Sequence, residues 1–298
     1  MSNYKNQVTL LLQALPEVAK EKSFAMHGGT AINLFVRDMP RLSVDIDLTY
    51  IPVEDRVTSF KNIIAALNNI KIRLSKILPE AVITITERNL KLQITTDKAQ
   101  IKLEVSQINR GIIADIIELE LCDKAQEGFD AYCTISVVSL GQLYGGKICA
   151  ALDRQHPRDL FDVKYLLAEE GFTDEIRRGF IFLLLSSKRP LNEILHPNLI
   201  DQRETMINHF DGMTTETFTY EDFENTRTEL IETIHQHLTA KDREFLINFS
   251  NLTPDWNIYN FEDFPAVQWK LQNLVSLKSS NLDKFNKQHQ DLKDLLNK

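Results

Sequence analysis

The chain has 298 residues and a net charge of -8, from 34 Lys and Arg against 42 Asp and Glu. This length allows one large domain or two of moderate size, and no stretch approaches the roughly 18 apolar residues of a membrane span. Residues 1–165 hold 20 basic and 20 acidic side chains, so residues 166–298 carry the whole acidic excess. A globally basic nucleic-acid-binding protein is therefore excluded, and a polynucleotide would need a local basic patch.

A glycine-rich turn is the first informative feature. Residues 4–20 have the spacing of an amphipathic helix, and a short apolar strand, 24–26, leads into Gly28-Gly29-Thr30. The glycines let the backbone turn tightly and approach a ligand closely. The N–H groups that open the following helix have no partner within it, which favours binding of an anion such as phosphate. The alternative is that the turn only connects a strand to a helix.

Two acidic side chains follow on the next strand. From Ser43 to Leu48 polar and apolar residues alternate, which puts Ser43, Asp45 and Asp47 on one face. Two carboxylates one pleat apart repel each other unless a cation lies between them. A hard cation such as Mg²⁺ binds carboxylates together with substrate phosphates. The order of residues therefore predicts a phosphate-binding turn followed by a divalent-cation site.

A long helix and several strands complete the first half. The helix is expected from Pro52 to Ile77, and strands are expected at 82–86, 90–95, 100–106, 112–121 and 132–138, with a polar loop between the last two. Alternation in the strand 100–106 puts Lys102 and Glu104 on one face. Arg110 follows this strand, where it either reaches a phosphate or lies on the surface.

Residues 140–167 contain a second group of charged side chains. A His-Pro break divides the stretch into two predicted helices. Five charged side chains lie on them: Lys147, Arg154, Arg158, Asp159 and Asp162. A helical hairpin held together by ion pairs from the two arginines to the two aspartates explains this pattern without any active site.

The remainder of the chain reads as helices. They are expected from Thr173, over 200–210 and 220–238, from Thr239, and over 265–277 and 282–296. Thr239 to Asp242 is typical of a capping box, with Asp in place of the usual Glu. Cys122, Cys133 and Cys149 are odd in number and lie among apolar residues, which favours reduced thiols and a cytoplasmic location over a disulfide framework.

These motifs together resemble a known family. Gly28-Gly29-Thr30-Ala31, Arg41-Leu42-Ser43, Asp45-Ile46-Asp47-Leu48 and the later helical Lys, Arg and Arg-Asp-x-x-Asp occur in the order found in AbiEii/AbiGii-type nucleotidyltransferase toxins. This family is part of the superfamily of DNA polymerase β, and the resemblance covers most of the chain. It implies an α+β fold, with a mixed sheet and flanking helices in a nucleotidyltransferase domain over residues 1–165. A helical C-terminal domain is then expected over residues 166–298.

The resemblance also implies roles for individual residues. Asp45 and Asp47 would hold Mg²⁺, with Mn²⁺ as a substitute, and Glu104 resembles the third carboxylate of the superfamily. Family members often have Asp at that position, and a solvent-facing Glu104 is the alternative. The implied nucleotide-binding residues are Gly28, Gly29, Thr30, Arg41, Ser43 and Lys147. The implied catalytic residues are Asp45, Asp47, Lys147 and Asp159, whereas Asp162 is expected to be structural.

The function implied is transfer of a nucleotidyl group from an NTP to an acceptor, with RNA, and tRNA in particular, as that acceptor. The protein would be the toxin of a bacterial toxin–antitoxin or abortive-infection pair, with a cognate antitoxin and no membrane partner. The basic ridge available for RNA consists of Lys147, Arg154 and Arg158, with Arg37 and Arg41 near the nucleotide. The alternative is a catalytically silent module that binds nucleotide or RNA. A P-loop NTPase is disfavoured because no Gly-Lys-Ser/Thr follows the glycines.

Overall fold

The computed structural model describes residues 2–297. Backbone contacts divide the chain into two compact units. The first, here called the sheet unit, contains the described residues before Leu140 together with Phe210–Thr217. The second, the helical unit, contains Leu140–His209 and the described residues from Phe218 onward. No helix within residues 2–297 is long and apolar enough to cross a membrane.

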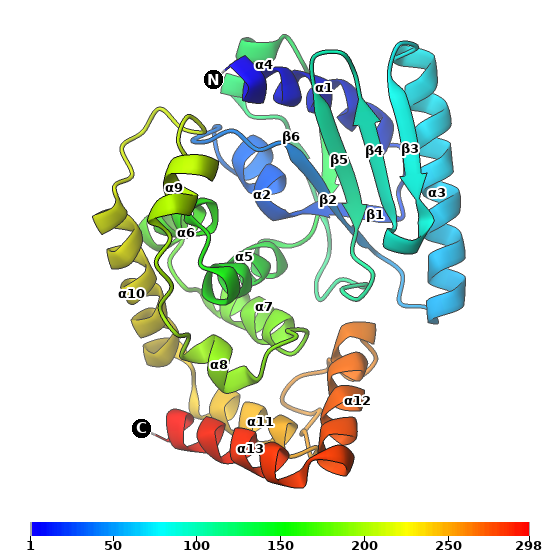
Figure 1. Ribbon diagram of the computed structural model, residues 1–298. Helices are drawn as coiled ribbons and strands as arrows, with labels where there is room; N and C mark the ends of the chain where they lie inside the picture. The colour runs from blue at the N-terminus through cyan, green and yellow to red at the C-terminus, as the bar shows by residue number, and fades with distance from the viewer. Residues whose placement is uncertain (1, 298) are drawn as a thin grey trace. The chain divides into compact units, whose positions relative to one another are not determined.

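The sheet unit is built on a seven-stranded mixed sheet with the order β3-β4-β5-β2-β1-β7-β6 (Figure 1). The strands are β1 Phe24–His27, β2 Asp45–Tyr50, β3 Val82–Thr86, β4 Lys91–Thr95, β5 Gln100–Val105, β6 Ile117–Glu120 and β7 Thr134–Val137. Two neighbouring pairs, β1 with β7 and β2 with β5, are parallel, and the other pairs are antiparallel. The predicted α+β class with a mixed sheet is confirmed.

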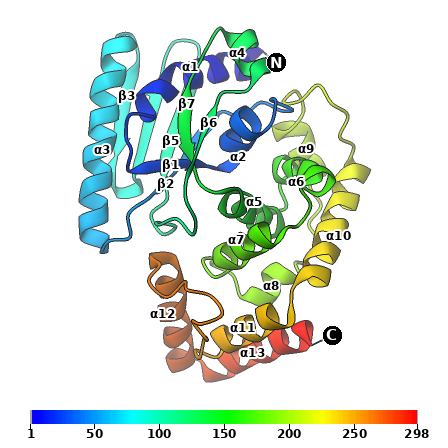
Figure 2. The ribbon, with the colours of Figure 1, turned by 180° about the vertical axis from the view of Figure 1, so that it is seen from behind.

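One face of this sheet is covered by two helices. Helix α1, Ser2–Val18, and helix α3, Arg56–Ile77, lie side by side on it (Figures 1 and 2). Alternate residues of the central strands, such as Ile46, Leu48 and Leu103, are at most 1% exposed and form the core. Because side chains alternate along a strand, the polar residues between them lie on the opposite face of the sheet.

Shorter helices complete the sheet unit. They are α2 Gly28–Ala31, the π-helical turn η1 Ile32–Val36, the 3₁₀ turn η2 Glu87–Asn89 and α4 Asp123–Phe129. Helix α4 occupies the segment where a polar loop was predicted, and that prediction is wrong. The strand predicted over 112–121 is shorter in the structure, where it extends only over Ile117–Glu120. The helix predicted from Pro52 begins at Arg56, because Asp55 accepts hydrogen bonds from the N–H groups of Val57 and Thr58 as its N-cap.

The helical unit contains nine helices within the described residues. They are α5 Leu140–Arg154, α6 Pro157–Glu169, α7 Asp174–Leu184, α8 Leu191–Leu195, α9 Arg203–His209, α10 Tyr220–His237, α11 Ala240–Ser250, α12 Pro265–Ser280 and α13 Leu282–Leu296. Helices α5 and α7 cross at glycines: a β-carbon added to Gly179 would overlap the carbonyl of Gly141, and one added to Gly145 would overlap Gly179. The capping box of Thr239 and Asp242 is confirmed. The division into compact units falls after Ser139, whereas the domain boundary at residue 165 stays a prediction.

Candidate active site

The glycine-rich turn lies beside the acidic strand because β1 and β2 pair antiparallel. Their register aligns His27 with Asp47, so Gly28, the next residue, comes against the Asp47 side chain. Gly28 has a φ of +79°, and a β-carbon there would lie 2.6 Å from Asp47 Oδ2. A side chain at residue 28 would therefore be both strained and in collision with the carboxylate. Only glycine lets the backbone approach Asp47 this closely.

The second glycine faces a guanidinium and a hydroxyl. A β-carbon at Gly29 would lie 2.7 Å from Arg41 Nη2 and 3.2 Å from Ser43 Oγ. The buried Thr30 hydroxyl is 2.9 Å from Ser43 Oγ and also donates to the backbone carbonyl of Asp45. The turn thus packs against both Arg41 and Ser43, and Thr30 ties it to the start of β2. We call the group of Gly28, Gly29, Arg41, Ser43 and Asp47 the cradle.

Arg41 is fixed by a segment distant in sequence. It is 3% exposed, and it forms an antiparallel bridge with Thr214, whose hydroxyl donates to the carbonyl of Pro40 at 2.8 Å. The N–H of Leu42 donates to the carbonyl of Met213 at 2.7 Å. These contacts hold the loop that carries Arg41, and no local sequence pattern indicates them.

The two predicted metal-binding aspartates lie on the polar face of β2. The parallel pairing of β2 with β5 aligns Asp45 with Lys102 and Asp47 with Glu104. Lys102 Nζ lies 3.7 Å from Asp45 Oδ1 and 3.6 Å from Glu104 Oε1, so one ammonium group lies between the two acidic side chains. The sequence predicted which side chains share this face, and the strand pairing brings them together.

Glu104 has cationic partners of its own. Lys91 Nζ lies 2.7 Å from Glu104 Oε1. Burial raises the pKa of Glu104, but the hydrogen bond from Lys91 and the charge of Lys102 outweigh it and hold the pKa below its ordinary value. Among residues 2–297 no three His, Cys, Asp or Glu side chains are grouped closely enough to hold a metal ion. The role of Glu104 as a third metal ligand stays a prediction.

The residues beside the turn nevertheless suit a hard cation. The Asp45 side chain keeps 31% of its surface exposed, and a carboxylate oxygen of Asp47 lies against the Gly28 backbone. Carboxylate oxygens are the donors that Mg²⁺ prefers, and it commonly completes its coordination with water and phosphate oxygens. Asp45 and Asp47 fit such an ion, and two carboxylates would leave positions for those other ligands.

Two polar residues of this region were not identified from the sequence. His27 Nδ1 lies 3.0 Å from the hydroxyl of Thr49, and Asn33 Nδ2 donates to the carbonyl of Gly29 at 2.9 Å. Asn33 is fully buried. A polar residue within the apolar run Ile32 to Val36 was the available signal, because a buried amide needs a hydrogen-bond partner. Asn33 holds the second glycine carbonyl and so helps fix the turn.

The helical unit contains the second predicted group, and its lysine is buried. Lys147 is 6% exposed, and its Nζ lies 2.8 Å from Asp159 Oδ1 and 2.9 Å from Asp162 Oδ2. Helices α5 and α6 are thereby joined across the break at His156, whose ring accepts a hydrogen bond from the N–H of Arg158 as N-cap. The hairpin expected from ion pairs is present, but Lys147 is at its centre.

Arg154 is the exposed cation of this cluster. Its Nε lies 2.6 Å from Asp159 Oδ2 and its Nη2 lies 3.0 Å from Oδ1, which is a two-point contact. The Arg154 side chain is 58% exposed, whereas that of Asp159 is 1% exposed. Burial raises the pKa of Asp159, but Lys147 and Arg154 together outweigh it and hold the pKa far below its ordinary range. Asp159 is therefore ionised and orients both cations.

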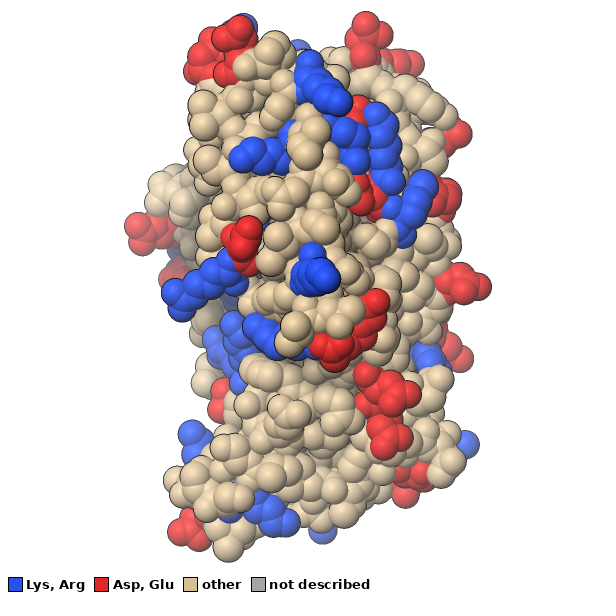
Figure 3. All heavy atoms as spheres, turned by 90° about the vertical axis from the view of Figure 1, so that its right-hand side faces the viewer, with Lys and Arg blue, Asp and Glu red and all other residues tan. Residues whose placement is uncertain are grey.

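The structure changes two expectations about basic side chains. Lys147 and Arg41 are 6% and 3% exposed, so neither can belong to an exposed ridge that docks RNA. Arg110 is also buried, at 4% exposed, with its Nη1 3.4 Å from the carbonyl of Asp55, and the surface interpretation of it is wrong. On the face shown in Figure 3, Lys and Arg side chains lie beside Asp and Glu and do not form one continuous basic surface.

Comparisons with known proteins identify the family of the chain and a solved structure with a similar fold. A solved structure, MenT4, a nucleotidyltransferase toxin from Mycobacterium tuberculosis H37Rv, matches with a TM-score of 0.64 and 12% identity over 91% of this chain and 93% of that chain. At this identity the likeness concerns the fold. No curated protein matches. The family model for the AbiEii nucleotidyl transferase toxin of type IV toxin–antitoxin systems matches residues 10–273. The chain therefore belongs to the AbiEii nucleotidyl transferase toxin family.

Proposed function

We propose that this nucleotidyltransferase toxin uses Mg²⁺, or Mn²⁺ in its place, to transfer a nucleotidyl group from an NTP to RNA, with tRNA as the acceptor. The observation that carries the proposal is the contact of the Gly28 backbone with the Asp47 carboxylate. This contact brings the glycine-rich turn and the acidic strand together, which supports a shared site for phosphate and metal. A type IV toxin implies a cognate antitoxin, and its family implies an NTP substrate.

The cradle would bind the triphosphate. The first backbone N–H groups of α2 have no partner within that helix, and the Arg41 and Ser43 side chains lie beside Gly29 in its first turn. Backbone donors, a guanidinium and a hydroxyl are the groups that hold phosphate oxygens. Because Arg41 is buried and tied to Thr214, it would offer its charge without further ordering, which is the preorganisation that favours phosphoryl chemistry.

Asp45 and Asp47 would hold the divalent cation, and Glu104 would join them if Lys91 and Lys102 release it. When bound, such an ion neutralises charge on the phosphates and activates an acceptor oxygen. Lys102 lies between Asp45 and Glu104 and would limit their repulsion before the ion binds. This arrangement supports a role for Asp45 and Asp47 as metal ligands.

In the helical unit, the charged group of Lys147, Asp159, Asp162 and Arg154 would act through Arg154, its exposed side chain. Lys147 is enclosed by Asp159 and Asp162, which supports a positioning role for the lysine. Arg154 keeps most of its side chain in solvent while Asp159 fixes its guanidinium at two points. We therefore propose that Arg154 contacts a backbone phosphate of the RNA, with Asp159 and Lys147 as positioning residues. Lys147 would then affect catalysis only indirectly, by holding Asp159, which positions Arg154.

The alternative, a binding module without transfer activity, makes a different forecast. Calorimetric titration with each NTP in Mg²⁺ would give binding in both cases. Incubation with total RNA and each α-labelled NTP would then give labelled RNA and pyrophosphate only if the protein is the proposed transferase. NTP binding without label in any RNA would favour the module. Labelled RNA that does not include tRNA would refute the acceptor but retain the transferase.

A further inference from the structure

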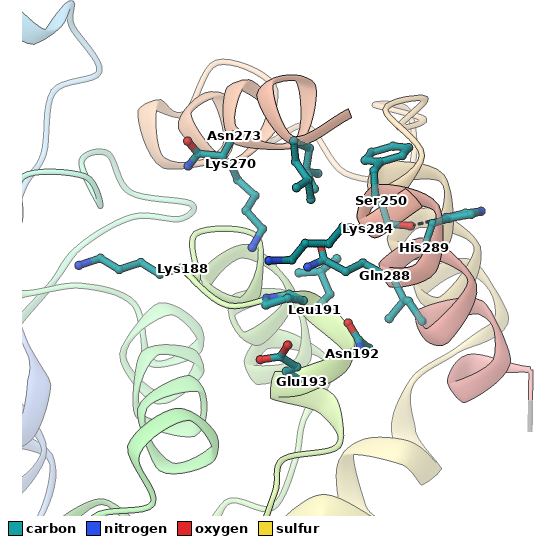
Figure 4. A pocket seen from close by; sticks show the side chains of 15 residues that line it. Lys188, Leu191, Asn192, Glu193, Ser250, Lys270, Asn273, Lys284, Gln288 and His289 are labelled. Atoms are coloured by element: carbon teal, nitrogen blue, oxygen red, sulfur yellow. Dashed lines mark hydrogen bonds between the residues drawn. The ribbon is translucent and has the colours of Figure 1, made fainter. Parts of the chain in front are cut away.

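A pocket in the helical unit lies between α8, α12 and α13 (Figure 4). Its volume is about 270 Å³, just below the usual range of roughly 300–1,000 Å³ for small-molecule sites. Apolar side chains form much of its wall: Leu191, Leu274, Leu277, Phe285 and Leu292. The pocket has no part in the nucleotidyl-transfer chemistry proposed above, and its residues all belong to the helical unit.

Two lysines converge on this pocket. In Figure 4 the side chains of Lys270 and Lys284 extend toward the same part of it, whereas Lys188 extends away. Lys270 is 5% exposed, and its Nζ donates to the carbonyls of Ser187 at 2.8 Å and Arg189 at 2.5 Å. An ammonium group has three donors, so one remains. Within the described residues, neither Lys270 nor Lys284 forms an ion pair with a carboxylate.

The charge of the pocket is positive at neutral pH. Glu193 is the one carboxylate among the lining residues, and its single negative charge is outnumbered by the charges of Lys270 and Lys284. His289 lies on the same wall, where burial and the charge of Lys293 lower its pKa. Burial lowers the pKa of Lys270 to about 8, with Glu193 opposing that change. An anion between the two ammonium groups would stabilise both charges and offset the cost of burying one of them.

We propose that this pocket binds a small amphipathic anion, whose charged group lies between Lys270 and Lys284 and whose apolar part packs against Phe285 and Leu274. The charged group can be a phosphate or a carboxylate, since an ammonium donates to the oxygens of either. The volume suits a compact ligand with a ring or short chain. An inorganic anion is not the preferred ligand, because it has no apolar part to pack against the apolar wall of the pocket. A ligand with an apolar part gains affinity by removing that wall from water.

Phenyl phosphate is a suitable probe, because it joins a phosphate to one apolar ring. Isothermal titration of the full chain should show phenyl phosphate binding more tightly than inorganic phosphate, and phenol should show no comparable binding. Lys284→Gln should weaken phenyl phosphate at least tenfold, because a hydrogen bond to a charged group contributes about 1.5–3 kcal/mol. Lys284 is exposed, so this variant should fold normally. Titration with phenylacetate, which has a carboxylate in place of the phosphate, shows which of the two charged groups the pocket prefers.

Lys287→Gln is the matched control on the same helix. Its side chain is 74% exposed and pairs with Asp291, and it does not line the pocket. The proposal predicts unchanged affinity for phenyl phosphate in this variant. Equal weakening in Lys284→Gln and Lys287→Gln would mean binding through general surface charge and would overturn the proposal. Inorganic phosphate bound as tightly as phenyl phosphate would overturn it too. Loss of phenyl phosphate binding alone leaves NTP binding at the cradle intact, so failure here and failure of the transferase are distinguishable.

Discussion

Lys147 Nζ lies 2.8 Å from Asp159 Oδ1, and both side chains are almost fully removed from solvent. Asp162 contacts the same ammonium at 2.9 Å. Each charge in this group therefore depends on the others for its stability, because an isolated buried charge is very costly. A lysine that the sequence suggests as a phosphate ligand is thus part of the packing between α5 and α6.

Lys147→Ala should lower the free energy of unfolding by about 3–5 kcal/mol, since it removes the ammonium that the buried Asp159 and Asp162 share and leaves Arg154 as the cation of Asp159. Lys164→Ala is the control: this lysine pairs with Asp222 at 3.0 Å but is 43% exposed, and about 1 kcal/mol or less is expected. Urea denaturation followed by circular dichroism measures both. Equal losses in the two variants would mean that the Lys147 network is no more important than a surface ion pair.

Asp159→Asn should have an effect that depends on pH. The pKa of Asp159 is held below its ordinary value in the folded protein, so its charge stabilises the fold above the unfolded pKa of about 3.9 and this contribution is lost as the pH falls. The difference in urea midpoint between wild type and Asp159→Asn should be large at pH 7 and should shrink below about pH 4. A difference that is constant from pH 7 to pH 3 would contradict the assignment.

Gly28→Ala should damage the cradle. The residue has a φ of +79°, and the new β-carbon would lie 2.6 Å from Asp47 Oδ2. We expect a stability loss of about 1–3 kcal/mol from the backbone strain alone, together with weaker NTP binding. Gly128→Ala is the control, because a β-carbon there meets nothing within 4 Å and α4 should gain up to about 1 kcal/mol. Thermal melting and calorimetric NTP titration test both variants.

Gly179→Ala should separate α5 from α7, because its β-carbon would overlap the Gly141 carbonyl. The Gly141 carbonyl is part of the α5 backbone and cannot move aside as a flexible side chain would. The melting temperature should therefore fall, or the helical unit should not fold. Gly146→Ala lies on α5 with its nearest neighbour, Leu183 Cγ, at 4.0 Å, and it should stabilise the helix by about 1 kcal/mol. A Gly179→Ala protein as stable as wild type would refute the close crossing.

The sequence predicted the features that depend on neighbouring residues. The alternation in β2 correctly placed Asp45 and Asp47 on one face. The Thr239 capping box could be predicted because its two partners are close in sequence. The family and the α+β class followed from the order of such motifs. The polar segment at Asp123–Phe129 was assigned wrongly, because it is a short helix whose composition also suits a loop.

Features that depend on distant contacts could not be predicted. Arg41 is buried because Met213 and Thr214 pair with its loop, and these residues lie far along the chain. The family resemblance implies a site role for Lys147, but a lone helical lysine gives no sign of its burial. The acidic partners were identified, but only the packing of α5 on α6 directs both carboxylates at Lys147. Nor does the alternation of β5 reveal that Lys91 comes from β4 to pair with Glu104.

If Asp45 and Asp47 hold a divalent cation beside the Gly28 turn, removal of either charge should abolish nucleotidyl transfer. The most direct test is the rate of label incorporation from α-labelled NTP into RNA, with Mg²⁺, by wild type, Asp45→Asn, Asp47→Asn and the control Asp97→Asn. Asp97 is an exposed residue in the turn between β4 and β5. We predict that both site variants lose transfer while keeping the wild-type melting temperature without Mg²⁺, and that Asp97→Asn remains active. Full transfer by a folded Asp47→Asn protein would mean that the Asp47 carboxylate is not needed for nucleotidyl transfer.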